Sequence, residues 1–351
     1  MAVIVKNNLL VRRLQEALPL VFMAALALYS VWPWLPLPGR TSTAHTIIFY
    51  GFSILDEAMN QRIFPAFQEE WQAASGDSIE FVSSFAGSGT ITNQIIMGVP
   101  ADIGVLPLEM DANRIAASGI TTSRSWQTLP HTGVINLTPF IILVRPGNPK
   151  NIRDFSDLVR PGVQVVHPDP LTSGSANWAI VAVYGAGLRQ NPGNPKAGYD
   201  LLLGVWRNVV AQASSARAAR TQFENGFGDA LITYEQEVLW DQTRGRLRGE
   251  IIYPRSTVLS EHMVIAIERN IEPDERGIVN SFIQFLWSKT AQRIFVEYGF
   301  RSVDEQMNAG NPAFGKIADP FLIEEFGGWE RAKPEIVDAI WKERVLKELE
   351  R

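Results

Sequence analysis

The chain contains no cysteine among its 351 residues. This absence excludes disulfides, thiolate metal sites, cysteine catalysis and a lipid anchor on cysteine. Histidine is scarce, with four residues, so few imidazoles are available for metal binding or acid–base chemistry. The sequence also has no low-complexity tract and enough apolar residues for a sizeable core, and its length favours two domains over one.

The sequence lacks a strong excess of either charge, with a formal net charge of −5 and a pI of about 5.6. This balance argues against nucleic acid as a main partner, because phosphate backbones are held by clusters of Lys and Arg. A small anion stays possible, since backbone dipoles hold anions without any net positive charge. There is no G-x-x-x-x-G-K-[ST] loop, no G-x-S-x-G nucleophile turn and no His/carboxylate cluster with metal-ligand spacing.

The N-terminus has the pattern of an export signal. Lys6, Arg12 and Arg13 precede an apolar run from Ala17 to about Leu37, and Ser42-Thr43-Ala44 offers a small-x-small cleavage site. We therefore interpret residues 1–44 as a signal peptide. The alternative is an uncleaved membrane anchor, because the run is nearly long enough to span a bilayer. In both cases the chain from about residue 45 is exported.

One pattern recurs four times: a short apolar strand ends in small or hydroxyl residues, and a helix follows. The predicted strands are residues 46–50, 79–82, 163–166 and 209–210. Strands that alternate with helices predict an α/β fold with mostly parallel sheets flanked by helices. Ligands in such sheets bind at the carboxyl ends of the strands, where all four turns lie.

The strands predicted at 139–145 and 262–267 lie far apart in the chain and could cross between two lobes. The prediction is a first lobe of residues 45–138 and 262–320 and an inserted second lobe of residues 139–261. The spacing of apolar residues in 321–351 predicts an amphipathic helical tail that packs on the lobes.

The turns themselves allow two interpretations. A Ser before a helix commonly caps it, and Ser53 with Asp56 predicts a capping box. However, Gly87 and Gly89 around Ser88, and the run Thr172–Ser175, exceed what capping needs and suggest that backbone N–H groups approach a ligand. A hydrolase nucleophile at Ser88 or Ser173 is a third possibility, although only His167 lies near one of these turns.

Longer segments carry a resemblance to a known family: "FIILVRPGNPKNIRDFSDLVRPGVQVVHPDPLTSGSANW" (140–178), "AGSGT" (86–90), "SSARAARTQF" (214–223) and "GFGDALITYEQEV" (226–238). On these motifs, residues 45–320 closely resemble the periplasmic sulfate-binding proteins of ABC importers. The resemblance implies a two-lobed periplasmic binding protein of type II, with the anion in the cleft between the lobes. It implies no catalysis and no cofactor.

The resemblance also implies a set of neutral hydrogen-bond donors around the anion. Ser88 would give its hydroxyl, and the other matched positions would give backbone N–H groups or a side-chain donor. The complete set carried over by motif is Ser53, Ser88, Gly89, Ser173, Gly174, Ser175, Ala216 and Tyr234.

Three positions depart from the family's pattern. Ser53 stands where the family has Asp, Ser175 where it has Gly, and Tyr234 near the family's Trp donor. A Tyr hydroxyl both donates and accepts, whereas an indole only donates, so sulfate, thiosulfate and other tetrahedral oxyanions remain candidates. Sulfate is favoured over phosphate, because hydrogen phosphate carries a proton and needs an acceptor. The nearest predicted carboxylates are Asp56 and Glu57, and Asp56 is expected to cap a helix.

The implied partners are a membrane permease and its ATPase, reached from the periplasm by a monomeric receptor. The alternatives are a receptor for molybdate or phosphate, a membrane-anchored anion sensor, and a secreted serine hydrolase.

Overall fold

The computed structural model describes residues 44–122 and 124–350. The strands in these ranges are β1 His45–Phe52, β2 Ile79–Ala86, β3 Ile103–Leu106, β4 Val134–Val144, β5 Val165–Pro168, β6 Val209–Ala213, β7 Ala230–Tyr234, β8 Glu250–Ile252, β9 Ser256–Ala266, β10 Arg301–Ser302 and β11 Asp319–Phe321. Apart from Ala44, the predicted signal or anchor lies outside the described residues. Among the helices that are described, none is long and apolar enough to cross a membrane.

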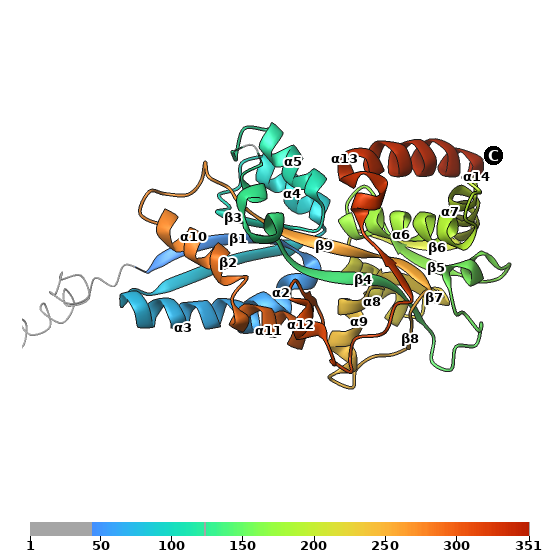
Figure 1. Cartoon of the computed structure of the whole chain (residues 1–351), viewed down its shortest axis with the longest axis horizontal. Helices are drawn as coiled ribbons and strands as arrows, with labels where there is room; N and C mark the ends of the chain where they lie inside the picture. Colours follow the sequence, from blue (N-terminus) through green and yellow to red (C-terminus); the bar gives the residue numbers. More distant parts are fainter. Residues whose placement is uncertain (1–43, 123, 351) are drawn as a thin grey trace, which may run out of the picture. The chain divides into compact units, whose positions relative to one another are not determined.

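The main strands are hydrogen-bonded in the order β2-β1-β3-β9-β4-β7-β5-β6. Strands β2, β1 and β3 are parallel, and so are β7, β5 and β6. The long strands β9 and β4 lie between these two groups and pair antiparallel with each other and with β3 and β7 (Figure 1). Two mostly parallel groups are thus joined by two antiparallel strands, and the predicted α/β class is confirmed.

Helices lie on both faces of this sheet (Figure 1). The α-helices are α2 Asp56–Ala58, α3 Phe64–Ser75, α4 Ser88–Ile96, α5 Glu109–Ala117, α6 Gly174–Gln190, α7 Ala197–Arg207, α8 Ala216–Glu224, α9 Glu235–Gln242, α10 Arg276–Phe285, α11 Lys289–Glu297, α12 Glu305–Asn308, α13 Gly328–Ala332 and α14 Lys347–Leu349. Short 3-10 helices are η2 Ser53–Leu55, η4 Ser125–Thr128, η5 Pro130–Gly133, η6 Phe155–Val159 and η7 Ile323–Phe326. The π-helical segments are η3 Met59–Ile63 and the longer η8 Lys333–Leu346.

The helices that follow the predicted turns begin earlier than their apolar residues indicate. The apolar positions predict helices starting at Ile91 and Trp178, but α4 begins at Ser88 and α6 at Gly174. The glycines and serines are therefore the first turn of each helix. The capping box predicted for Ser53 and Asp56 is wrong: Ser53 is inside the helical turn η2, and the residue before it, Phe52, has no side-chain cap.

Aromatic rings hold the helices to both parts of the sheet. Phe282 of α10 is fully buried, with its ring centroid 5.1 Å from that of Phe67 and 4.8 Å from that of Phe81. At the C-terminus, Trp341 packs on Trp206 of α7 with centroids 5.1 Å apart. The C-terminal stretch η8 packs its apolar side chains against α6 and α7, which explains its amphipathic pattern.

Candidate functional site

Four helical starts meet at one end of the strands. The turn η2 and the helices α4, α6 and α8 directly follow or closely succeed β1, β2, β5 and β6, respectively. The first backbone N–H groups of a helix have no partner within the helix, and the helix end carries a partial positive charge. Helix starts that converge in this way favour a bound anion.

A small cavity lies between these starts. Seven of the eight predicted site residues line it, together with Phe52, Gly87 and Pro107: Ser53, Ser88, Ser173, Gly174, Ser175, Ala216 and Tyr234. Gly89 does not line it, and its N–H donates instead to the Thr172 carbonyl at 3.1 Å. The sequence therefore identified residues that share one cavity, apart from Gly89.

Close backbone approach explains why glycine is needed at Gly174. A Cβ atom there would lie 2.5 Å from Ser88 Oγ and 2.8 Å from Pro107 Cγ. The Gly174 N–H donates to Ser88 Oγ at 2.8 Å, and the Trp178 indole N–H donates to the Pro107 carbonyl at 2.6 Å. The first bond ties the start of α6 to the start of α4, and the second ties α6 to the segment that follows β3. They also show that two predicted donors, Ser88 and Gly174, are bonded to each other.

The other hydroxyls of the site have different surroundings. Ser173 Oγ and Ser175 Oγ lie 2.7 Å apart and share one hydrogen bond. The Tyr234 hydroxyl is buried and has no hydrogen-bond partner in the described part of the chain. Burial, with the nearby Glu237 carboxylate, raises the Tyr234 pKa well above its ordinary value, so this hydroxyl keeps its proton. Tyr234 is therefore a neutral donor at the cavity wall.

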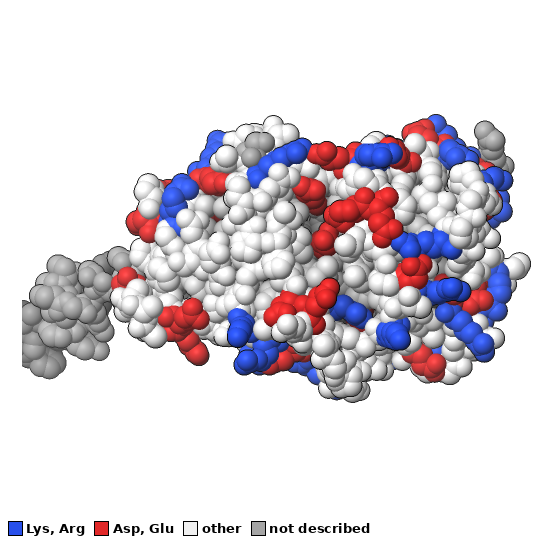
Figure 2. Space-filling model, in the orientation of Figure 1, with Lys and Arg blue, Asp and Glu red and all other residues white. Residues whose placement is uncertain are grey.

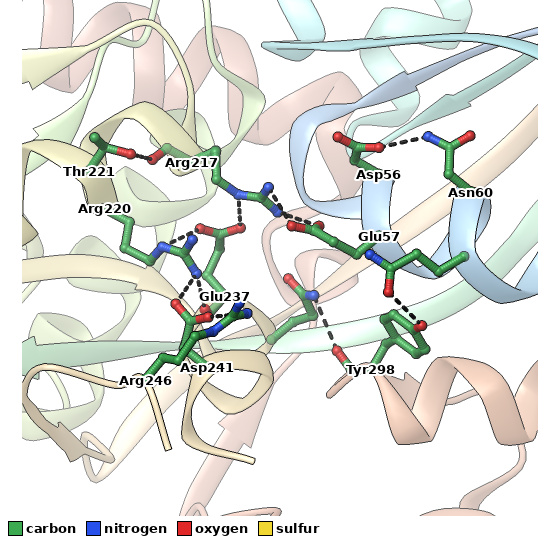
Figure 3. Close-up of polar contacts among 12 residues, drawn as sticks. Asp56, Glu57, Asn60, Arg217, Arg220, Thr221, Glu237, Asp241, Arg246 and Tyr298 are labelled. Carbon is green, nitrogen blue, oxygen red and sulfur yellow. Dashed lines mark hydrogen bonds and ion pairs between the residues drawn. The ribbon is translucent and has the colours of Figure 1, made fainter. Parts of the chain in front are cut away.

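The two carboxylates expected nearest the site are engaged elsewhere (Figure 3). Asp56 accepts a hydrogen bond from Asn60 at 2.7 Å. Glu57 accepts two hydrogen bonds of 2.8 Å from the Arg217 guanidinium, which also donates to Glu237 at 2.9 Å. Neither Asp56 nor Glu57 is among the residues that line the cavity.

Sequence reasoning missed Asp111, a buried carboxyl at the first turn of α5. A second, larger cavity is lined by Asp111 and shares Ser88, Ser173 and Gly174 with the first. Burial raises the pKa of Asp111, whereas Arg114 and the Ser88 and Thr92 hydroxyls lower it. No motif marks this residue, because α5 follows a strand that the sequence did not link to the four turns.

Comparisons with known proteins identify the family of the chain. The family model for the bacterial extracellular solute-binding proteins matches residues 55–301. A sulfate-binding protein of Synechococcus elongatus is 30% identical over 86% of this chain and 85% of its own, and one of Escherichia coli is 32% identical over 77% and 83%. The solved sulfate-binding protein SubI of Mycobacterium tuberculosis matches with a TM-score of 0.76 and 28% identity, over 83% of this chain and 99% of its own.

The chain belongs to this family of solute-binding proteins. The relatives bind solutes and are not described as enzymes. Two histidines of this solute-binding protein are buried. His167 has its Nε2 unpartnered within the described residues, and burial lowers its pKa to about 4. His262 bonds Asn136 and lies near Ser260.

The surface gives no sign of a nucleic-acid interface on the face drawn in Figure 2. Acidic and basic side chains are interspersed there, without an extended basic area. Within residues 44–122 and 124–350, no group of three or more His, Cys, Asp or Glu side chains is arranged to hold a metal ion.

Proposed function

We propose that this protein is the periplasmic receptor of an ABC importer and binds sulfate or thiosulfate. The observation that carries the proposal is the small cavity, which is walled by helix starts and neutral donors and has no carboxylate among its lining residues. A fully deprotonated dianion needs only donors, whereas hydrogen phosphate needs an acceptor for its proton. The proposed ligand contacts are the hydroxyls of the five predicted cavity residues that carry one and first-turn N–H groups such as that of Ala216. The N–H groups of Gly89 and Gly174 donate within the protein.

The lobes and their movement are part of the same proposal. Residues 45–138 with 262–320 form one lobe, residues 139–261 form the other, and residues 321–351 pack on them. The antiparallel pair β4 and β9 connects the two groups of parallel strands and is the proposed hinge region. Donors come from both lobes, so the anion favours the closed state, which the permease and its ATPase then recognise. Residues 1–44 direct export as a signal peptide or remain as an anchor, and the receptor acts as a monomer.

Isothermal titration of the exported, purified protein tests the function. Bound anion is first removed, and sulfate, thiosulfate, molybdate and phosphate are then titrated separately. We expect one-to-one binding of sulfate or thiosulfate and no heat with phosphate. Equal binding of phosphate would reject the proposal that the site contains only hydrogen-bond donors. Tight binding of molybdate alone would show that the ligand is molybdate and not sulfate or thiosulfate. If none of the four anions gave heat of binding, the proposed function would be rejected and only the fold would be retained.

A paired variant locates the binding in the cavity. Gly174→Val should abolish the titration signal, because its side chain would displace Ser88 and Pro107. Gly277→Val is the control, since nothing lies within 4 Å of a Cβ at this exposed glycine of α10. Unchanged affinity in the Gly174 variant would reject this cavity as the site.

A further inference from the structure

His262 of β9 packs against two residues of the cavity wall without lining the small cavity itself. Its ring is fully buried, and its centroid lies 4.6 Å from that of Phe52 and 5.5 Å from that of Tyr234. Both of these aromatic residues line the cavity. Phe52 ends β1 and Tyr234 ends β7, so they belong to different groups of parallel strands. One imidazole therefore contacts aromatic wall residues from both groups.

A hydrogen bond holds this imidazole in one orientation. Its Nδ1 lies 2.6 Å from the Oδ1 atom of Asn136 on β4. An amide oxygen accepts and does not donate, so Nδ1 carries the proton and donates it. Burial lowers the pKa of His262 to about 3, so the ring is neutral near pH 7. The ring of Phe300 packs on the imidazole as well, with centroids 5.9 Å apart. The imidazole is therefore a neutral ring that is fixed by a bond between the two long strands.

Core packing alone does not explain a polar pair at this place. Asn136 is fully buried, and its Nδ2 has no hydrogen-bond partner in the described residues. Burying polar groups costs free energy, and an unpaired one costs most. The imidazole has aromatic neighbours, so an apolar side chain of similar volume would fill the space at a lower cost. What the bond to Asn136 adds is a fixed direction for the ring of His262.

We propose that His262 is a positioning residue: it holds Phe52 and Tyr234 in place, keeps the cavity small and so favours sulfate over larger oxyanions of the same charge. The inference rests on the proposed function and names the property of the anion that the site selects, which is its size. Close-packed walls reject a larger group only when they cannot move back. If the ring is removed or free to turn, Phe52 and Tyr234 can retreat and the preference for the smaller anion weakens.

Titration calorimetry with sulfate and with molybdate tests this role, and the ratio of the two dissociation constants is compared between variants. Molybdate is also a tetrahedral dianion but has longer bonds, so the ratio reports on size. We expect the wild-type protein to bind sulfate more tightly. His262→Leu lacks the flat ring and its hydrogen bond, so the preference for sulfate should fall by about tenfold. Asn136→Leu leaves the ring without its acceptor, and a smaller loss of preference is expected.

A second buried histidine provides the matched control. His167 is 1% exposed, packs on Trp206 with ring centroids 4.8 Å apart and does not line the small cavity. His167→Leu should lower the thermal stability, as His262→Leu does, but leave the ratio of the two dissociation constants unchanged.

A double-mutant cycle shows whether His262 acts through Tyr234. Tyr234→Phe removes the hydroxyl and should weaken sulfate binding in the wild-type background. The same change should matter less in the His262→Leu background, because the hydroxyl is then no longer held in place for the anion. A purely structural role for His262 predicts additive effects instead.

Three results would overturn the inference. They are a wild-type protein that binds molybdate as tightly as sulfate, a folded His262→Leu variant that keeps the wild-type ratio, and additive effects in the double-mutant cycle. If His262→Leu is unfolded by circular dichroism, an unchanged ratio in Asn136→Leu overturns the inference in its place. Each of these results leaves sulfate binding itself intact. A wild-type protein that binds neither anion would instead reject the proposed function.

Discussion

At the scale of single residues, the most informative atom of the site is the Tyr234 hydroxyl. Its ring is fixed by Phe140, 4.6 Å away between centroids, and by His262 at 5.5 Å. A buried hydroxyl without a hydrogen bond costs stability. A residue that is held rigidly at such a cost is expected where a ligand supplies the missing partner.

The Tyr234→Phe variant should therefore separate binding from stability. We expect sulfate affinity to fall by about 1–2 kcal/mol, or roughly tenfold in Kd. The thermal stability of the anion-free protein should be unchanged or higher, because no hydrogen bond is lost. Titration calorimetry and thermal unfolding without anion measure the two effects.

A second tyrosine provides the matched control. Tyr199 of α7 donates its hydroxyl to Glu348 and does not line the anion cavity. Tyr199→Phe should therefore lower stability by about 1 kcal/mol and leave binding unchanged. If Tyr234→Phe behaved in the same way, Tyr234 would not be a ligand donor.

At the scale of helices and strands, the small cavity depends on how helices begin. Small residues at the starts of α4 and α6 let the two helices approach until Gly174 N–H reaches Ser88 Oγ. Arg217, in the first turn of α8, is then close enough to α2 and α9 to join Glu57 and Glu237 (Figure 3). The Glu237 side chain is fully buried, and it also lies 3.4 Å from Arg220.

Removing Arg217 should leave this buried carboxylate with a single cation. We expect Arg217→Met to lower the free energy of unfolding by about 3 kcal/mol, because an unbalanced buried charge is costly. Urea unfolding measures the loss. Arg62→Met is the control, since the Arg62–Glu297 pair is about half exposed and should contribute about 0–1 kcal/mol. Equal losses in the two variants would show that burial of Glu237 does not matter.

At the scale of the whole molecule, the strands β4 and β9 connect the two groups of parallel strands. Strand β9 has buried residues along its length and pairs with β11 of the C-terminal segment. The ring of His262 on β9 packs on the cavity residues Phe52 and Tyr234. Glu261, on the same strand, has its pKa raised to about 7 by burial and by Glu324 and Glu109. The folded protein therefore holds this proton more tightly than the unfolded chain does.

Glu261 should make the folded protein less stable as the pH rises. Its full contribution is present below the ordinary Glu pKa of 4.5 and is lost as the pH passes through about 7. Relative to wild type, Glu261→Gln should gain stability across this range, by about 3 kcal/mol at most. Urea unfolding at pH 5 and pH 8 measures the gain. A difference that does not change with pH would contradict the assignment.

Several features were predictable because they depend on local sequence. The four strand–turn–helix units, the two long strands that join them and the helical tail follow from apolar periodicity and small residues. Seven residues that line the small cavity were identified by motif, and that they bind an anion stays a prediction. The capping box predicted for Ser53 and Asp56 is wrong, because the helical turn begins one residue earlier and Asp56 accepts a hydrogen bond from Asn60 instead.

The sequence by itself determined the class of fold, the family and the neutral, donor-rich character of the site, because these depend on residue types and short spacings. Only the tertiary structure decided which donors are free. It paired Ser88 with Gly174, turned Gly89 toward Thr172, left Tyr234 without a partner and placed Asp111 behind the cavity. These facts depend on groups that are far apart in the chain, and their hydrogen bonds, burial and pKa exist only after the two groups of strands are joined.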